Sequence, residues 1–201
     1  MQRSLFDDGA ERAEIPAIPG LVYRADYLLP EQERELLARI DAEPWRSDWQ
    51  RRTQHYGTSY PSREARRRPP VVLGAIPSWL AWLGERLAAD GLVERVPENV
   101  VVNEYLPGQG IAPHKDLADF GPTVVSVSLG APVVMRLAHE SGAPAHELLL
   151  APRSALAIGG EARAAWLHGI ARRKSDRWQG RGLPRARRVS VTFRTVRRRR
   201  P

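Results

Sequence analysis

Short runs of alternating apolar and polar residues fill the second half of the chain, and they limit the possible fold more than any other feature. A period of two is typical of β-strands with one buried face. Turns containing Gly and Pro separate the runs, which favours a barrel or a sandwich. The expected strands span residues 99–105, 123–129, 132–137, 147–150, 154–158, 164–168 and 187–196.

Two helices are expected before these strands. Pro30 suits the first turn of a helix in which Leu36 and Ile40 share an apolar face, and a second helix follows Pro77. Residues 46–70 are rich in Arg, Ser, Tyr and Pro without a helical period, so we expect loops and short hairpins there. The expected fold class is therefore mainly β with flanking helices (α+β), a barrel buttressed by N-terminal helices.

The length of 201 residues suits one domain with its own core. We expect a leader over residues 1–20, the domain over 21–196 and a basic tail over 197–201. The net charge is +8, and four of these charges come from Arg197–Arg200; this tail is either a solvated end or a phosphate-binding segment. The chain has neither a long apolar run nor a secretory signal, so we expect a cytoplasmic monomer without membrane contact.

Cysteine is absent, so any metal site must use histidine and carboxylate ligands. His114 and Asp116 are two positions apart, which places both on one face of a strand. His168 could complete a set of two histidines and one carboxylate, which leaves coordination positions on iron open for other ligands. His-x-Asp pairs also arise by chance, and buried histidines are often only hydrogen-bonded, so these residues alone leave the question open.

The last expected strand has one apolar face and one polar face. Its apolar residues are Val189, Val191 and Phe193, and its polar residues are Arg188, Ser190, Thr192 and Arg194. If the polar face points outward, the arginines are solvated. If it points into a barrel, they require anions, because an unpaired buried charge costs several kcal/mol.

Five ordered motifs resemble the AlkB family of Fe(II)/2-oxoglutarate-dependent dioxygenases. They are Asn103-Glu104-Tyr105, then Pro107-Gly108-Gln109-Gly110-Ile111 with His114-Lys115-Asp116, then Val125-Ser126-Val127-Ser128-Leu129-Gly130, then Gly160-Glu161-Ala162-Arg163 with Trp166 and His168-Gly169-Ile170, and finally the strand from Arg188 to Arg194. The resemblance implies a double-stranded β-helix (jelly-roll) barrel in a single AlkB-like domain over residues 21–196.

The resemblance also implies a site and a reaction. His114, Asp116 and His168 correspond to the iron ligands. The residues that correspond to the 2-oxoglutarate pocket are Asn103, Tyr105, Arg188, Ser190 and Arg194, with Arg188 on the distal carboxylate. The implied cofactors are Fe(II), 2-oxoglutarate as cosubstrate and O₂, which together hydroxylate a C–H bond; an oxidised N-methyl group is then lost as formaldehyde.

The implied substrate is an alkylated or modified base in nucleic acid, in single-stranded DNA or RNA, tRNA included. Residues 46–70 correspond to the nucleotide-recognition lid of the family, and the candidate substrate-binding residues there are Arg51, Arg52, Gln54 and Tyr56. Tyr56 is the expected stacking residue. Arg51, Arg52 and the cluster Arg66–Arg68 could hold phosphates.

Within the family, the string from Arg51 to Gly57 and the Gly-Gln-Gly-Ile sequence are most similar to the AlkB domain of the animal tRNA wobble-uridine hydroxylase. Ala118 stands where DNA-repair members carry a carboxylate, which puts repair of methylated bases in doubt. Two other hypotheses are a dioxygenase acting on a protein side chain or small molecule, and a catalytically silent nucleic-acid-binding module.

Overall fold

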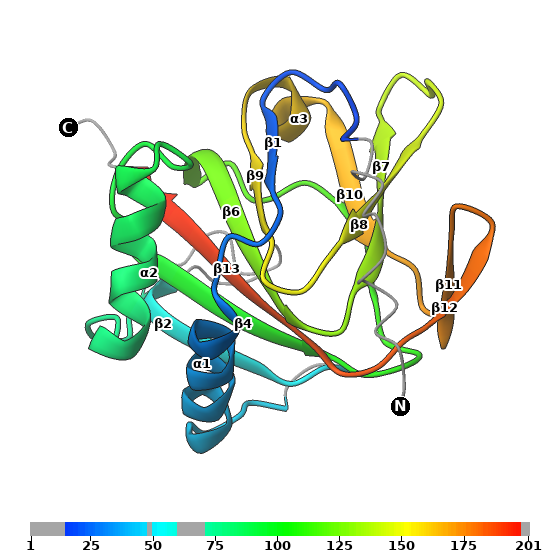
Figure 1. Ribbon diagram of the computed structural model, residues 1–201. Helices are drawn as coiled ribbons and strands as arrows, with labels where there is room; N and C mark the ends of the chain where they lie inside the picture. The colour runs from blue at the N-terminus through cyan, green and yellow to red at the C-terminus, as the bar shows by residue number, and fades with distance from the viewer. Residues whose placement is uncertain (1–14, 48–49, 60–70, 198–201) are drawn as a thin grey trace.

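The computed structural model describes residues 15–47, 50–59 and 71–197. Two antiparallel sheets form a jelly-roll barrel (Figure 1). The larger sheet has the order β1-β9-β6-β13-β4-β2-β3 and the smaller has the order β5-β10-β7-β8. The bounds of the larger sheet are β1 Leu21–Arg24, β2 Thr53–Ser59, β3 Val71–Val72, β4 Asn99–Tyr105, β6 Phe120–Gly130, β9 Ala155–Ile158 and β13 Arg188–Val196. Those of the smaller sheet are β5 Ile111–His114, β7 Val133–His139, β8 His146–Leu150 and β10 Trp166–Ile170.

Two helices, α1 (Pro30–Ala42) and α2 (Ser78–Ala89), cover the outer face of the larger sheet (Figure 1). One apolar cluster joins them to the sheet. Its fully buried members include Ile40 of α1, Leu83 of α2, Val127 of β6 and Phe193 of β13. Within the described residues, no helix is long and apolar enough to cross a membrane.

A second apolar cluster lies on the inner side of the barrel and joins the two sheets. It includes Tyr105 of β4, Leu137 of β7, Leu156 of β9 and Trp166 of β10. The larger sheet therefore has an apolar outer face under the helices, and its inner face is left to a mixture of apolar and polar side chains. Those polar side chains carry the candidate site.

β13 is the central strand of the larger sheet. It pairs with β4 on one side and β6 on the other, so that Arg188 lies opposite Tyr105 and Gly130. Val189, Val191 and Phe193 are fully buried in the helix-side cluster, which turns Arg188 and Arg194 toward the inside of the barrel. The expected alternation of this strand is confirmed, with its polar face inward.

Three local expectations were wrong. Residues 46–70 were expected to hold loops and short hairpins, yet Thr53–Ser59 is a regular strand that pairs with β4 over its first five residues and with β3 over its last two. The strand expected at 164–168 begins at Trp166, because a short helix, α3 (Gly160–Ala164), precedes it. Asp116 lies beyond the end of β5 at His114, and is not in the same strand.

Several expectations extend beyond the described residues. Residues 1–14 of the expected leader, 48–49 and 60–70 of the expected lid region, and 198–201 of the basic tail lie outside the described residues. The arginine cluster at 66–68 is among them. Two further strands, β11 (Ser175–Trp178) and β12 (Arg181–Pro184), form a separate hairpin between β10 and β13.

Candidate active site

Two antiparallel strands bring the two candidate histidines together. β5 and β10 pair so that His114 lies directly opposite His168, and the centroids of the two rings are 4.4 Å apart. Directly opposite residues of antiparallel strands share a face. Asp116 follows β5, and its Oδ2 atom lies 3.6 Å from Nε2 of His168. The three candidate iron ligands are therefore neighbours.

These side chains do not yet form a finished coordination sphere. In the described part of the chain, no group of three His, Cys, Asp or Glu side chains is already arranged as a metal-binding set. The strand register nevertheless fixes the backbones of His114 and His168 opposite one another, and the Asp116 carboxylate lies beside His168. The His114 side chain is half-buried, so its ring has room to turn toward a metal ion.

The protonation states at this cluster suit a divalent cation. Burial alone would raise the pKa of Asp116, but the positive charge of Arg194, with that of His168, outweighs burial and lowers the pKa to about 2. Burial lowers the pKa of His168 to about 4, although Asp116 opposes this shift. At neutral pH the site thus offers a carboxylate and a neutral imidazole, the forms that bind metals.

Neighbouring groups leave one donor atom free on each of two ligands. Nδ1 of His114 lies 2.9 Å from the carbonyl oxygen of Ala112; because a carbonyl can only accept, Nδ1 carries the proton and Nε2 keeps its lone pair. Arg194 donates from Nε to Oδ1 of Asp116 over 2.8 Å, while Oδ2 faces His168. Nε2 of His114 and Oδ2 of Asp116 are therefore the available donors.

Arg188 is a buried cation without a carboxylate partner among the described residues. It is 2% exposed, donates from one terminal nitrogen to Oγ of Ser128 over 2.8 Å, and lies 5.3 Å from the Tyr105 ring centroid. Its Nε atom is buried and has no hydrogen-bond partner in the described part of the chain. Burial lowers the pKa of Arg188 to about 10, so the guanidinium stays charged at neutral pH. Such a group calls for an anion.

The remaining candidate cosubstrate residues lie near Arg188 on the inner sheet face. Tyr105 is opposite Arg188, and Asn103 is opposite Ser190, in the β4–β13 register. The hydroxyls of Ser190 and Ser126 are 2.7 Å apart. Together with the charge on Arg188, these hydroxyl and amide groups make a polar cluster suited to binding a small dicarboxylate.

Of the four candidate substrate residues, only Arg51 points into the barrel. Its Nε donates to Oδ1 of Asn103 over 3.0 Å, and its guanidinium lies 5.4 Å from the Tyr105 ring centroid. Arg52 pairs instead with Glu104 on the outer side.

Gln54 and Tyr56 lie on the helix side of β2. The amide of Gln54 donates to the carbonyl of Ile40 in α1 over 2.7 Å, and Tyr56 contacts the edge of Trp79 in α2. Burial raises the pKa of Tyr56 to about 12. The structure therefore does not bring Arg52, Gln54 or Tyr56 to the His–Asp cluster. The strand alternation instead turns His55, opposite Val101, toward the inner face.

Sequence reasoning gave no role to Arg163, although it quoted this residue in a motif. Arg163 of α3 donates from Nε to the carbonyl of Gly121 over 3.0 Å and from a terminal nitrogen to that of Leu117 over 2.9 Å. These carbonyls belong to the segment that follows Asp116. Arg163 therefore holds the backbone that positions Asp116. No spacing of residues in the sequence predicts such a contact.

Replacing Arg163 with lysine is expected to weaken metal binding by roughly 10- to 100-fold, the usual effect of losing a group that orients a metal ligand. Lysine keeps the charge but cannot reach two carbonyls from one planar group. Calorimetry with Mn(II), which does not undergo oxidation during the titration, measures the affinity. Unchanged Mn(II) affinity, with an unfolding temperature like that of the original protein, would contradict this positioning role.

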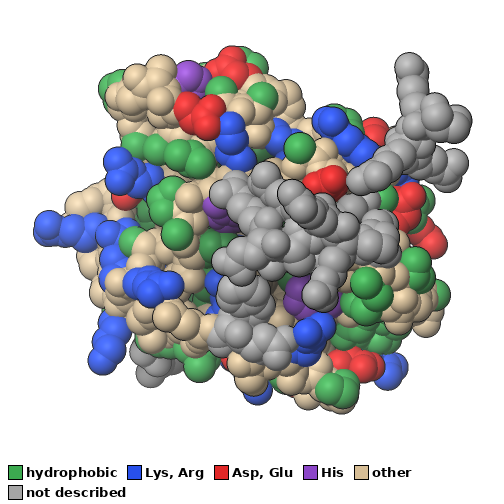
Figure 2. All heavy atoms as spheres, turned by 180° about the vertical axis from the view of Figure 1, so that it is seen from behind, with side chains coloured by type: hydrophobic (Ala, Val, Ile, Leu, Met, Phe, Trp, Pro, Cys, Tyr) green, Lys and Arg blue, Asp and Glu red, His purple; other side chains and the backbone are tan. Residues whose placement is uncertain are grey.

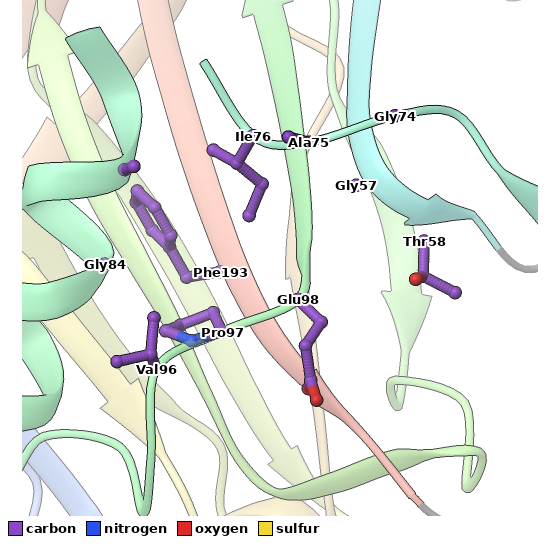
Figure 3. Close-up of a pocket in the computed structure, with 11 residues that line it drawn as sticks. Gly57, Thr58, Gly74, Ala75, Ile76, Gly84, Val96, Pro97, Glu98 and Phe193 are labelled. Atoms are coloured by element: carbon purple, nitrogen blue, oxygen red, sulfur yellow. The ribbon is translucent and has the colours of Figure 1, made fainter. Parts of the chain in front are cut away.

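A pocket of about 310 Å³ lies away from this cluster, between α2 and the strands β2 and β13 (Figure 3). Its lining includes Gly57, Ile76, Pro97 and Phe193, with Glu98 as its carboxylate and no histidine. Such a lining offers a metal ion one ligand only. The donor set therefore favours the His114–Asp116–His168 cluster as the active site.

Comparisons with known proteins agree with the fold. The model of the 2OG-Fe(II) oxygenase superfamily matches residues 20–194. The solved structure of OsALKBH1 superposes with a TM-score of 0.65 over 88% of this chain and 98% of that chain, at 18% identity.

Two curated relatives are more similar in sequence. An uncharacterised protein of Acanthamoeba polyphaga mimivirus is 36% identical over 173 residues, which span 85% of this chain and 82% of that protein. The tRNA (carboxymethyluridine(34)-5-O)-methyltransferase alkbh8 of Xenopus tropicalis is 35% identical over 165 residues, 79% of this chain. This alignment spans only 26% of the frog protein.

Proposed function

The chain belongs to the 2OG-Fe(II) oxygenase superfamily, in its AlkB family, and from this premise we propose that it oxidises an alkylated or modified base in nucleic acid. Members of this superfamily use Fe(II), 2-oxoglutarate and O₂, so the chain is a 2-oxoglutarate-dependent non-haem iron dioxygenase. One observation carries the assignment of the site. The buried Nε of Arg188 has no hydrogen-bond partner among the described residues, and Arg188 lies on the same inner face as Arg194, which contacts Asp116.

We assign roles to the residues from this geometry. Nε2 of His114, Oδ2 of Asp116 and His168 would hold the iron. Arg188 would bind the distal carboxylate of 2-oxoglutarate through the nitrogen that now lacks a partner. The hydroxyls of Tyr105 and Ser190 and the amide of Asn103 would complete that pocket.

When bound, the iron with 2-oxoglutarate and O₂ supplies the oxidation of a C–H bond that carries no acidic proton. The chain contributes placement and charge. Arg194 keeps Asp116 ionised and holds one of its oxygens, so that a single oxygen faces the cation. Burial keeps His168 neutral, and the apolar cluster around Trp166 keeps water from the inner side of β10.

The nucleic-acid substrate is supported by the frog relative, whose name specifies a tRNA-modifying enzyme. Arg51 also supports a nucleic-acid substrate. Its charged group lies on the inner face beside Asn103 and Tyr105, where it could contact a phosphate. We propose that residues 21–196 act as one dioxygenase unit and that single-stranded DNA or RNA, tRNA included, is the partner.

Succinate formation is expected to rise severalfold when tRNA or an oligonucleotide with methylated bases is added to the protein with Fe(II) and 2-oxoglutarate. A bound substrate couples the oxidation of 2-oxoglutarate to the oxidation of the substrate, which raises the turnover of 2-oxoglutarate above its rate without substrate. Mass spectrometry of succinate and of the digested nucleosides measures both products. The matched control is the unmodified oligonucleotide of the same sequence.

Turnover that no nucleic acid stimulates and that salt does not affect would contradict this proposal. It would favour a protein side chain or a small molecule as the substrate, since phosphate contacts make nucleic-acid binding depend on salt.

A further inference from the structure

The β11–β12 hairpin projects from the barrel as a separate two-stranded sheet (Figure 1). We call residues 172–184 the basic hairpin. An isolated two-stranded hairpin is marginally stable in water. Its order therefore depends on how the rest of the fold holds it, and the structure shows a strong attachment at its base.

A buried carboxylate attaches the basic hairpin to the barrel. Asp176 is 1% exposed and accepts hydrogen bonds from the Nε of Arg173 over 2.6 Å and from Arg185 over 2.7 and 2.8 Å. It also accepts from the backbone of Val134 in β7. Arg185 in turn donates to the carbonyl of Ala171. These charge-assisted bonds fix the base of the hairpin.

The tip of the basic hairpin is a tight two-residue turn. Gln179 and Gly180 both have positive φ angles, 48° and 78°, as in a type I′ turn, whose twist matches that of the flanking strands. The pairing of Trp178 with Arg181 closes the turn. With its base and its tip both fixed, the hairpin presents its side chains on a rigid support.

Four cationic side chains of the basic hairpin are exposed: Arg172, Lys174, Arg177 and Arg181. Within the described parts of the chain, none of the four forms an ion pair, and the one carboxylate of the hairpin is used by Arg173 and Arg185. Arg177 pairs with Gly182 and Arg181 with Trp178, so these two cations lie on opposite faces of the hairpin near its tip. Like charges gathered on one small element repel one another. A rigid element that holds them without counter-charges is suited to a polyanion.

Gly182 adds an independent observation. It lies in β12 opposite Arg177, and a Cβ atom built on it would meet nothing within 4 Å. Its φ angle is not positive, so neither space nor backbone conformation requires a glycine. Glycine inside a strand weakens the strand, and it often marks the close approach of another backbone. The missing side chain leaves a flat surface beside Arg177.

The basic hairpin lies beside the candidate active site along the chain, since β10 carries His168 and ends at Ile170. In the view from behind, Lys and Arg side chains gather on the side where β11 and β12 lie, and histidines reach the surface toward the middle of the same face (Figure 2). A nucleic-acid strand whose target nucleobase enters the barrel would therefore pass near these charges.

We propose that the basic hairpin binds the ribose–phosphate backbone of an RNA substrate. Arg177 contacts a phosphate on the face that it shares with Gly182, where the missing side chain allows the backbone to approach, and Arg181 contacts a phosphate at the turn. This inference rests on the proposed function and deepens it. It assigns to the hairpin the binding of nucleotides outside the base that is oxidised. Such contacts give affinity without sequence preference.

The double variant Arg177→Ala/Arg181→Ala tests the charges. For a methylated single-stranded RNA, its dissociation constant is expected to rise at least about tenfold, and the slope of log K against log salt to fall by about 1.4, from two lost contacts at about 0.7 each. The matched control is Arg34→Ala/Arg39→Ala on the exposed surface of α1, which removes the same charge. The control is expected to bind RNA like the original protein.

The variant Gly182→Thr tests the surface separately from the charge. Threonine favours strands, so the unfolding temperature is expected to hold or rise while RNA binding weakens several-fold. Succinate formation without nucleic acid is expected to stay unchanged in all variants.

Four outcomes would overturn the inference, and they are distinguishable. If the original protein binds RNA and the hairpin variants bind equally well, the inference fails while the proposed function stands. If the original protein binds no RNA or single-stranded DNA, both fail. If the variants lose binding to vesicles of anionic lipid but not to RNA, the hairpin is a membrane contact. Loss equal to that of the α1 control would indicate an effect of net charge alone.

Discussion

Replacing Arg188 with methionine is expected to weaken 2-oxoglutarate binding by about 100-fold or more, with no loss of stability in the protein without cosubstrate. Removing one partner of a buried ion pair costs about 3–5 kcal/mol, which corresponds to this range of affinity. Without the cosubstrate, however, Arg188 is a buried charge whose Nε has no hydrogen-bond partner within residues 15–47, 50–59 and 71–197. Methionine removes that cost and fills a similar volume.

Two measurements separate these effects. Thermal unfolding without cosubstrate is expected at the same temperature or higher than in the original protein. The increase that 2-oxoglutarate causes in the original protein is expected to disappear, because a ligand stabilises only the state that binds it.

Ser128→Ala is the matched control, since it removes one hydrogen bond to the same guanidinium and keeps the charge. We expect a rise in the KM for 2-oxoglutarate of roughly tenfold, from a hydrogen bond to a charged group. An Arg188→Met variant with an unchanged KM would exclude Arg188 from the cosubstrate pocket.

Replacing Asp116 with asparagine is expected to lower succinate formation by at least about 100-fold. Losing a group that merely orients a metal ligand costs 10- to 100-fold, and Asp116 would bind the metal itself. Asparagine has almost the same shape but no charge, so the change isolates the carboxylate. It also leaves Arg194 without its anion.

Binding of Mn(II), followed by calorimetry, checks this result without depending on turnover. Asp119→Asn is the matched control, because Asp119 is an exposed carboxylate three positions further along the same segment. If the Asp119 variant loses Mn(II) and the Asp116 variant keeps it, the assignment of the metal site is wrong.

Much of the barrel could be predicted because its strands have one apolar face. In β13, the side chains of Val189, Val191 and Phe193 alternate with polar ones, and the buried state of all three follows directly from that pattern. Because successive side chains of a strand point to opposite faces, burial of these three residues under the helices also places Arg188 and Arg194 on the other face. The candidate iron ligands follow from the family motifs and not from alternation, because Asp116 lies beyond the end of β5; the strand pairing adds that His114 and His168 are opposite.

The misplaced residues have a common physical cause. β2 is covered on both faces, by the helices on one side and by the barrel interior on the other. Because polar residues occur on both faces, its sequence lacks the alternation of apolar and polar residues that predicts a strand. Gln54 is buried because carbonyl groups at the end of α1 accept its amide hydrogens. A contact of this kind depends on the position of α1 in space, which the local sequence does not contain.

The basic hairpin was missed for a different reason. A run of arginines is usually a solvated surface, and only the structure shows that Asp176 is buried beneath it. Likewise, the sequence shows a glycine at position 182 but not that the space beside it is empty.

The position of β13 has a consequence for how the molecule is assembled. This strand inserts between β4 and β6, and both precede it in the chain. Until it arrives, each of those strands has an open edge, and open edges invite pairing with other molecules. A polypeptide cut before residue 188 would lose Arg188 and would leave β4 and β6 each with an unpaired edge that can pair with another molecule. Loss of activity and aggregation would therefore occur together.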